Sequence, residues 1–370
     1  MYLKKITGAQ PFFFNKKKIT NDFNNIIKSG QLSNGIHSEK FEQLFNKTID
    51  TKFSVSVNSG GTALEIALES LNIKNKEVIV PTQTFIASAN SVVRAGGMPV
   101  FCDIDKKTGC ANLETIKKKI TKKTAGVVFV YMFGIIPYSI LEIKRFCKKN
   151  NIFLLEDAAH AHGASIKGHK VGSIGDISTF SFYSTKILTS GEGGVISTNN
   201  KKLYEKCKII RNHGKDLRKN LFIYPGNNFR LSEIQCMLAY HQLRFIKKFI
   251  NHRNKIAKIY YQNLKNCKFL EFVQLHPKAT NSFWRYPLYL LKKNRIKLQK
   301  ALLNRYNIRI TWMYEPLCHQ QPIYKKIKQK KLLVAEKAIK QLLNLPTHYG
   351  VNEKEAKKIS QNLLKEINNI

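Results

Sequence analysis

The stretch Ser181-Phe182-Tyr183-Ser184-Thr185-Lys186-Ile187-Leu188-Thr189-Ser190-Gly191-Glu192-Gly193-Gly194 holds a single lysine in a polar, glycine-rich turn between two apolar runs. The two runs, residues 177–182 and 194–198, are predicted strands. Upstream, the apolar run 152–155 ends in Glu156-Asp157. Farther upstream, Gly60-Gly61-Thr62 follows an alternating run and opens a predicted helix. A lysine, an aspartate and a glycine-rich helix start therefore each follow a predicted strand.

Predicted strands and helices alternate along residues 53–198. The strands are short apolar or alternating runs, and the segments between them have the apolar spacing of helices. This alternation predicts an α/β fold with a mainly parallel sheet between helices. Ligands of such sheets bind beyond the carboxyl ends of the strands, where the three polar features lie. The predicted strands are residues 53–58, 77–80, 99–102, 125–130, 152–155, 177–182 and 194–198, and the predicted helices are 62–71, 85–95, 113–120 and 140–149.

A long helical stretch from Leu231 to about Lys265 follows the sheet region. We place a domain boundary within it, near Arg253, which gives a large domain at residues 1–253 and a smaller C-terminal α+β domain at 254–370. The smaller domain is predicted to hold strands at 284–290 and 308–312 and a final helix at 352–367.

Length and composition indicate a large folded protein. The 370 residues can bury a sizeable core and form about two domains. Hydrophobic residues make up 43% of the chain, which excludes a largely disordered protein. The longest apolar run, near Val127 to Pro137, is too short to span a bilayer, and no signal-peptide core follows Met1. We therefore expect a cytoplasmic protein without membrane insertion. The seven cysteines are scattered and lack metal-site spacing, so we expect reduced thiols and no bound metal.

The formal net charge is +39, and this invites a nucleic-acid-binding interpretation. The lysines are spread along the whole chain beside many Asn, Ile, Phe and Tyr residues, which is typical of a compositional bias rather than of a binding patch. We expect no specific nucleic-acid partner, but the charge should help to attract an anionic substrate.

The lysine, the aspartate and the helix start are the parts needed to hold pyridoxal phosphate. The amine of Lys186 can form a Schiff base with the cofactor aldehyde. The carboxylate of Asp157 can pair with the protonated pyridine nitrogen and keep the ring an electron sink. The glycine-rich start of the predicted helix, at Gly60-Gly61-Thr62, can take the phosphate. The ordered set is much more specific than any one of these residues.

Further motifs in the same order resemble the DegT/DnrJ/EryC1/StrS sugar aminotransferase family, a branch of the fold-type I pyridoxal phosphate enzymes. The resemblance covers nearly the whole chain. The motifs that carry it are Ser29-Gly30, Gly35 with Phe41-Glu42, Pro81-Thr82-Gln83-Thr84-Phe85, Glu156-Asp157-Ala158-Ala159-His160-Ala161-His162-Gly163, residues 181–186, Gly191-Glu192-Gly193-Gly194, Arg211-Asn212-His213-Gly214, Asn228-Phe229-Arg230 and Leu345-Pro346.

The resemblance implies a role for each matching residue. Lys186, Asp157 and His160 are the expected catalytic residues, with His160 against the cofactor. Asn228 is expected to reach the phosphate of the neighbouring subunit of a homodimer with shared active sites. The family commonly has Gly-Thr-Ala where this chain has Gly-Gly-Thr-Ala, so the threonine is offset by one. The expected cofactor-binding residues are Gly60, Gly61, Thr62, Phe85, Asp157, His160, Ser181, Lys186 and Asn228. The candidates for the substrate pocket are Tyr183, Arg230, Tyr314 and His319, and His348 is a further candidate.

Five of these residues also have a purely structural interpretation. Lys186 can be a surface lysine, and Asp157 can cap a helix. His160 can be a buried structural histidine, and Phe85 can belong to a helix core. Asn228 can be a turn residue.

The resemblance further implies transfer of an amino group from glutamate to a nucleotide-linked ketosugar. The expected substrate is a 4-keto-6-deoxyhexose, and the expected product is an aminosugar for a surface polysaccharide such as a lipopolysaccharide O-antigen. One alternative is a pyridoxal-phosphate sugar dehydratase of the same fold, although that branch has histidine in place of the lysine. Another is a non-catalytic, basic DNA-binding regulator. A nucleotide-binding dehydrogenase fits poorly, because no Gly-x-Gly-x-x-Gly follows the first strand.

Overall fold

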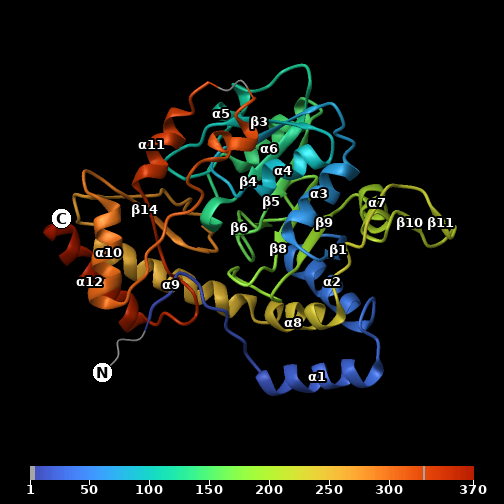
Figure 1. Cartoon of the computed structure of the whole chain (residues 1–370), viewed down its shortest axis with the longest axis horizontal. Helices are drawn as coiled ribbons and strands as arrows, with labels where there is room; N and C mark the ends of the chain where they lie inside the picture. The colour runs from blue at the N-terminus through green and yellow to red at the C-terminus, as the bar shows by residue number, and fades with distance from the viewer. Residues whose placement is uncertain (1–4, 328–329) are drawn as a thin grey trace.

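A seven-stranded sheet forms the centre of the molecule (Figure 1). The computed structural model describes residues 5–327 and 330–370. The neighbouring strands are parallel except at β9, which runs antiparallel to both of its neighbours, so the prediction of a mainly parallel sheet is confirmed. The strand order is β1 (Phe53–Val57), β9 (Gly194–Thr198), β8 (Ile177–Ser181), β5 (Phe153–Asp157), β4 (Thr124–Val130), β2 (Glu77–Pro81) and β3 (Met98–Cys102).

The inner strands are nearly continuous apolar runs because both of their faces are covered. All residues of β8 and β9 are buried, as are the last four of β2 and β5. Helix α3 packs against β8 and β9, and α2 packs against β1 and α8. In Figure 1, α8 separates α1 from the rest of the molecule. The helices of this part are α1 (Lys16–Ser29), α2 (Ile36–Ile49), α3 (Gly60–Ser70), α4 (Ala87–Arg94), α5 (Leu113–Lys117), η1 (Met132–Gly134), α6 (Ile140–Lys149), α7 (Lys201–Arg211) and α8 (Glu233–Leu243).

A second, antiparallel sheet lies toward the C-terminus, in the order β12 (Leu270–Phe272), β14 (Tyr286–Leu290) and β15 (Leu342–Leu345). The N-terminal segment reaches this region, since the amide of Ile6 donates to the carbonyl of Asn307 at 3.0 Å. The helices here are α9 (Ile246–Leu264), α10 (Arg295–Tyr306), η2 (Cys318–Gln320), η3 (Pro322–Tyr324), α11 (Leu333–Gln341) and α12 (Glu353–Asn369).

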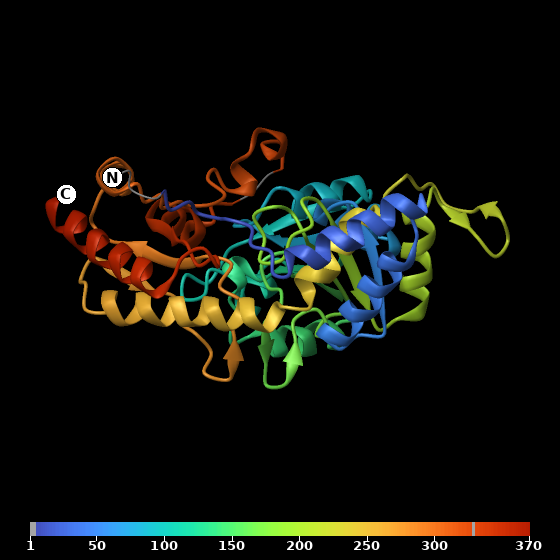
Figure 2. The same ribbon diagram turned by 90° about the horizontal axis from the view of Figure 1, so that it is seen from below.

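Short strands form two smaller features. In Figure 2 the hairpin of β10 (Lys215–Asp216) and β11 (Leu221–Phe222) projects from the body. A three-stranded ribbon is formed by β6 (Ser165–Ile166), β7 (His169–Lys170) and β13 (Ala279–Thr280).

Two predictions about the C-terminal half are wrong. The helix predicted from Leu231 to Lys265 is broken between α8 and α9, where Phe245 leaves the helical conformation and its ring lies 4.6 Å from that of Phe14. The strand predicted at 308–312 does not form a ladder, because Ile308 bridges to Ile6 whereas Thr311 bridges to Asn344. The division into residues 1–253 and 254–370 stays a prediction, and it falls inside α9.

The pairing of β1, β9 and β8 brings three turns that are distant in sequence together at one end of these strands. Gly194, the first residue of β9, lies opposite both Val57 and Ser181. A side chain at Gly194 would lie 2.3 Å from the carbonyl oxygen of Ser59, so only glycine allows this approach. The end of β1, the start of α3 and the end of β8 are therefore held within contact distance of one another.

Candidate active site

A cavity of about 400 Å³ opens beyond the carboxyl ends of β5 and β8. Its position agrees with the general rule for ligand sites in open α/β sheets. The sequence-predicted residues that line it are Gly60, Gly61, Phe85, Asp157, His160, Ser181, Tyr183, Lys186 and Tyr314.

The start of α3 forms one wall of the cavity. The hydroxyl of Ser59 caps the helix by accepting from the amide of Thr62 at 3.0 Å, and the hydroxyls of these two residues lie 2.9 Å apart. Thr62 is therefore engaged with the cap and does not line the cavity. This wall of the cavity is instead formed by Gly60, Gly61 and Ser181, beside the positive end of the helix dipole. Their peptide groups and the hydroxyl of Ser181 are the polar groups available to a ligand. This wall can bind a phosphate group.

Asp157 is a buried carboxylate at the end of β5. Its Oδ2 accepts from the hydroxyl of Ser88 at 2.7 Å, and its Oδ1 accepts from the amide of Ala159 at 3.2 Å. Burial raises the pKa of Asp157, while the hydrogen bond from Ser88 acts in the opposite direction. A buried carboxylate that faces a cavity is stabilised by a cationic ligand group, so this site suits a protonated ring nitrogen.

Lys186 extends into the same cavity rather than onto the outer surface. Its Nζ lies over the indole of Trp284, 4.8 Å from the ring centre. The indole Nε1 of Trp284 donates to the carbonyl of Thr185 at 2.8 Å, which fixes the turn that carries the lysine. Desolvation lowers the pKa of Lys186 to about 8, although Asp157 opposes this shift. About a tenth of the amine is therefore uncharged at pH 7, far more than for an ordinary lysine.

His160 lies between two aromatic side chains. Its ring stacks on Trp284 with the centroids 3.8 Å apart, and its Nε2 lies 3.2 Å from the hydroxyl of Tyr314. Burial holds the pKa of His160 well below its usual range, and the charge of Lys186 adds to this effect, so the imidazole is neutral. Burial also raises the pKa of Tyr314, which keeps its hydroxyl protonated and able to donate to Nε2. His160 thus presents an uncharged ring to the cavity.

His162, for which the sequence predicted no role, belongs to the hydrophobic core. Its ring packs edge-on against Phe180 and Phe182, with centroids 5.3 and 5.2 Å away. Burial lowers its pKa to about 3, so it is neutral.

Aromatic rings line the cavity on its more open side. Phe85 is 56% exposed and Tyr183 is 45% exposed, although both line the cavity. Phe85 precedes α4 and lies 5.9 Å from the ring of Tyr314. The helix-core interpretation of Phe85 is therefore wrong, and its exposed face can stack on a planar ligand.

Besides Thr62, four predicted residues do not line this cavity. The segment of Asn228 and Arg230 is held beside β1, because the amide of Asn58 donates to the carbonyl of Phe229 at 2.9 Å. The guanidinium of Arg230 donates to the side chain of Asn212. His319 lies between Thr82 and Glu336, with ring nitrogens 2.6 and 3.3 Å from their oxygens. His348 faces the carbonyl of Thr7 at 2.9 Å.

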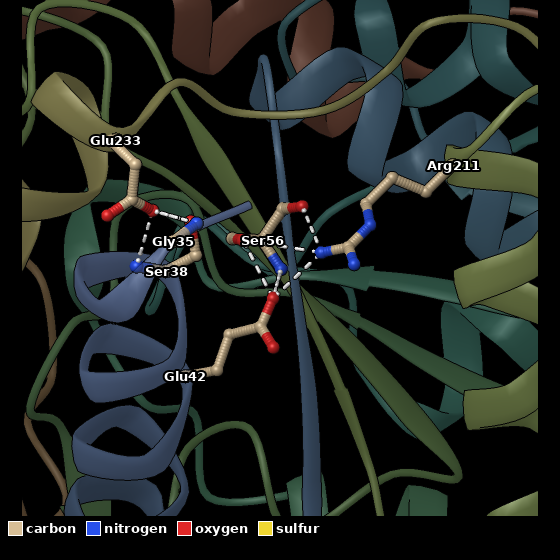
Figure 3. Close-up of polar contacts among 6 residues, drawn as sticks. All are labelled: Gly35, Ser38, Glu42, Ser56, Arg211 and Glu233. Atoms are coloured by element: carbon tan, nitrogen blue, oxygen red, sulfur yellow. Dashed lines mark hydrogen bonds and ion pairs between the residues drawn. The ribbon is translucent and has the colours of Figure 1, made fainter. Parts of the chain in front are cut away.

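A larger cavity of about 600 Å³ is lined by Arg230, Glu42 and Arg211, among other residues. Figure 3 shows the polar contacts in which Glu42 and Arg211 take part. The carboxylate of Glu233 accepts from the amides of Gly35 and Ser38, each at 2.9 Å, at the N-terminus of α2. The carboxylate of Glu42 accepts from the amide of Ser56 and from the guanidinium of Arg211, each at 2.8 Å. These bonds fix α2 and α7 to β1, and hence the position of the turn at Asn58 and Ser59.

Among the cavity-lining residues that were not predicted, Ser59, Ser88 and Trp284 contact the predicted ones directly. Ser59 could have been found, because a serine directly before a helix is a typical N-cap. Ser88 and Trp284 lie 69 residues upstream and 127 residues downstream of Asp157, and no local pattern connects them to it.

Within the ranges 5–327 and 330–370, no group of His, Cys, Asp or Glu side chains is arranged to hold a metal ion. All seven cysteines are unpaired thiols. No helix in the described part of the chain is both long and apolar enough to cross a membrane.

Comparison with known proteins gives one family for nearly the whole chain. The model of the DegT/DnrJ/EryC1/StrS aminotransferase family matches residues 14–364. GDP-perosamine synthase of Escherichia coli O157:H7 is 32% identical over 359 residues, covering 95% of this chain and 96% of that protein. A UDP-4-amino-4,6-dideoxy-N-acetyl-beta-L-altrosamine transaminase of Campylobacter jejuni is 32% identical over 346 residues, covering 91% of each chain.

The structure agrees with the sequence comparison. The Helicobacter pylori protein PseC, an aminotransferase involved in the biosynthesis of pseudoaminic acid, superimposes with a TM-score of 0.92 at 27% identity, covering 99% of this chain and 100% of that one. The predicted resemblance, the fold-type I architecture and the cofactor are thereby confirmed. The chain belongs to the DegT/DnrJ/EryC1/StrS aminotransferase family, and it is an enzyme, an aminotransferase that uses pyridoxal phosphate.

Proposed function

We propose that the protein transfers the amino group of glutamate to a nucleotide-linked 4-keto-6-deoxyhexose, in the cytoplasm, for the synthesis of a surface polysaccharide such as an O-antigen. Glutamate becomes 2-oxoglutarate, and the ketone of the sugar becomes an amine. The names of two relatives refer to GDP-linked and UDP-linked sugars, and one of them refers to a 4-amino-4,6-dideoxy sugar. A 4-amino-6-deoxy product implies a ketone at C4 of the substrate.

The observation that carries this proposal is that one cavity brings together three features. They are the phosphate cradle, by which we mean Gly60, Gly61 and Ser181, the carboxylate of Asp157 and the amine of Lys186. Pyridoxal phosphate fits this arrangement, and when bound it supplies an aldehyde for amines and a ring that withdraws electrons. The amides of Gly60 and Gly61 and the hydroxyl of Ser181 would hold its phosphate. Asp157 would pair with its ring nitrogen, while Phe85 and His160 would flank the ring.

Lys186 would attach the cofactor and then move the proton at the α-carbon of the amino donor. A general base works best when its pKa is near the working pH, and the pKa of about 8 for Lys186 meets this condition. His160 would stay neutral beside it, because burial and the charge of Lys186 both disfavour a protonated imidazole.

The sugar would enter at the open side of the cavity, past Tyr183 and Tyr314. The net charge of +39 would attract its diphosphate. Asn228, Arg230 and His319 lie outside the cavity of one chain, so for Asn228 we propose a contact with the phosphate in the partner subunit of a homodimer. We propose that Arg230 and His319 contact the nucleotide sugar.

The function can be tested with a panel of nucleotide sugars. The protein, reconstituted with pyridoxal phosphate, is incubated with glutamate and with 4-keto or 3-keto hexoses linked to GDP, UDP or dTDP. Mass spectrometry is expected to find 2-oxoglutarate and a new amine with a 4-keto substrate. Amino transfer to ordinary keto acids, with no response to any ketosugar, would refute the proposal.

A further inference from the structure

Arg285 is a buried arginine without a carboxylate partner in the described part of the chain. It is only 5% exposed. Its Nη1 donates to the carbonyl of Trp284 at 3.3 Å, and its Nε has no hydrogen-bond partner among residues 5–327 and 330–370. Burying an uncompensated charge is costly, so its presence close to the active site calls for a functional explanation.

The guanidinium of Arg285 shares one indole ring with the amine of Lys186. Its Cζ lies 4.5 Å from the ring centre of Trp284, and the Nζ of Lys186 lies 4.8 Å from the same centre. The separation of the two charges is therefore smaller than the sum of these distances. The indole itself is fixed, because it stacks on His160 and donates to Thr185. This rigid arrangement keeps the two cations close together.

Arg285 is one of several groups that act on the amine of Lys186, and Asp157 opposes it with a larger effect. Asp157 is the buried carboxylate that faces the amine, and it favours the charged amine, whereas Arg285 and removal from water favour the uncharged one. His160 is neutral and Tyr314 stays protonated. The remaining charged groups are Glu192, which lines the cavity, and the buried Arg253, whose Nη1 donates to the carbonyl of Trp284 at 3.2 Å.

We propose that Arg285 is a positioning residue that acts through Lys186: its buried guanidinium, held on Trp284, favours the uncharged amine that can attack a carbonyl carbon. The inference rests on the proposed function only in taking Lys186 as the reactive amine. Arg285 is not among the residues that line the cavity, so in this role it needs no contact with a ligand bound there. It acts by its charge, and Trp284 maintains the distance.

The charge of Arg285 can be removed while its packing on the indole is largely kept. Two charges about 9 Å apart at an effective dielectric constant of about 20 shift a pKa by about one unit. In Arg285→Met the pKa of Lys186 is therefore expected to rise by about one unit, and in Arg285→Lys it should stay close to that of the wild type. The exposed Arg145 provides the matched control, because Arg145→Met removes the same charge from the surface.

The measurement uses the protein without added cofactor. Competitive acetylation over a range of pH, followed by mass spectrometry of the peptide that carries Lys186, gives the pKa of its amine. At pH 7.5 the labelling of Lys186 in Arg285→Met should fall by up to about tenfold. Arg285→Gln, which keeps a donor for the carbonyl of Trp284, replaces Arg285→Met if circular dichroism shows that the latter is unfolded.

Two results would overturn the inference: an unchanged pKa of Lys186 in the folded Arg285 variants, or an equal rise in Arg145→Met. Failure of the proposed function is recognised separately. Wild-type protein that forms no absorbance band with pyridoxal phosphate would refute the role of Lys186 itself. A normal band in the wild type together with an unchanged pKa in Arg285→Met would refute the role of Arg285 alone.

Discussion

Gly60 and Gly61 are adjacent glycines at the start of α3, but the structure predicts opposite effects when each is replaced by alanine. A methyl group at Gly60 would lie 2.6 Å from Cβ and 3.2 Å from Cα of Ser181. The last residue of β8 would have to move, and overpacking of this kind costs about 1–3 kcal/mol. The gain from replacing glycine in a helix is about 0.5–1 kcal/mol. Gly60→Ala is therefore expected to lose about 1–2 kcal/mol of unfolding free energy.

Gly61→Ala is the matched control. Its new methyl group would find its nearest neighbours, Ala87 and Ser59, at 3.8 Å, which is an ordinary contact. Only the helix gain remains, so this variant should be more stable than the wild type by about 0.5–1 kcal/mol. Urea unfolding of the cofactor-free proteins measures both values.

The displacement of Ser181 in Gly60→Ala should also weaken the binding of the cofactor phosphate. Because Gly60 and Ser181 form the proposed cradle together, Gly60→Ala should bind pyridoxal phosphate about tenfold less tightly, which corresponds to about 1.4 kcal/mol. Gly60→Ala combined with Ser181→Gly should recover part of the lost stability, since the closest contact is removed. The reasoning is refuted if Gly60→Ala is as stable as Gly61→Ala, or if both variants bind the cofactor equally well.

Four further predictions concern the proposed chemistry. Lys186→Ala should bind pyridoxal phosphate without a borohydride-reducible bond, and a reducible adduct with retained turnover would contradict the assignment. Asp157→Asn should fold normally but lose about 10²–10³ in rate, as expected when a preorganised charge is removed from a developing anion, and near-normal turnover would disprove its role. Mixing Lys186→Ala with Asn228→Ala should restore activity in hybrid dimers, whereas a fully active monomer would exclude a shared site. Finally, between about pH 8 and pH 10.5 the folded, cofactor-free protein binds fewer protons at Lys186 than the unfolded chain does, so its unfolding free energy should rise with pH relative to that of Lys186→Met. For this half-buried side chain we expect a rise of about 2 kcal/mol over that range. Urea unfolding of the two proteins at several pH values measures it, and a difference in unfolding free energy that does not change with pH would contradict the prediction.

The sequence was most informative where local pattern and tertiary structure agree. The apolar runs of β2, β4 and β5 predict buried parallel strands, because a strand covered on both faces must be apolar on both. The lysine, the aspartate and the glycines could be assigned to one site because each follows such a strand.

Features that depend on a distant partner could not be predicted. The break after α8 occurs where Phe245 packs against Phe14, and neither local spacing nor composition records this contact. The segment at 308–312 has the composition of a strand, but its two bridges go to different parts of the chain. Trp284 is one of many aromatic residues until the fold places it against His160 and Lys186.

The reversed strand β9 has a consequence for how the protein is made. Strand β1 leaves the ribosome first among the strands of the large sheet. Among the described residues β9 is its only neighbour in that sheet, and Phe53 pairs with Thr198. The turn at Ser59 that follows β1 therefore has no fixed place beside Ser181 until about residue 200 has been synthesised. Nascent chains shorter than this should be unable to retain pyridoxal phosphate, and they would display an unpaired strand edge of the kind that recruits chaperones. Binding of the cofactor is thus expected late in translation, only after β9 has paired with β1 and β8.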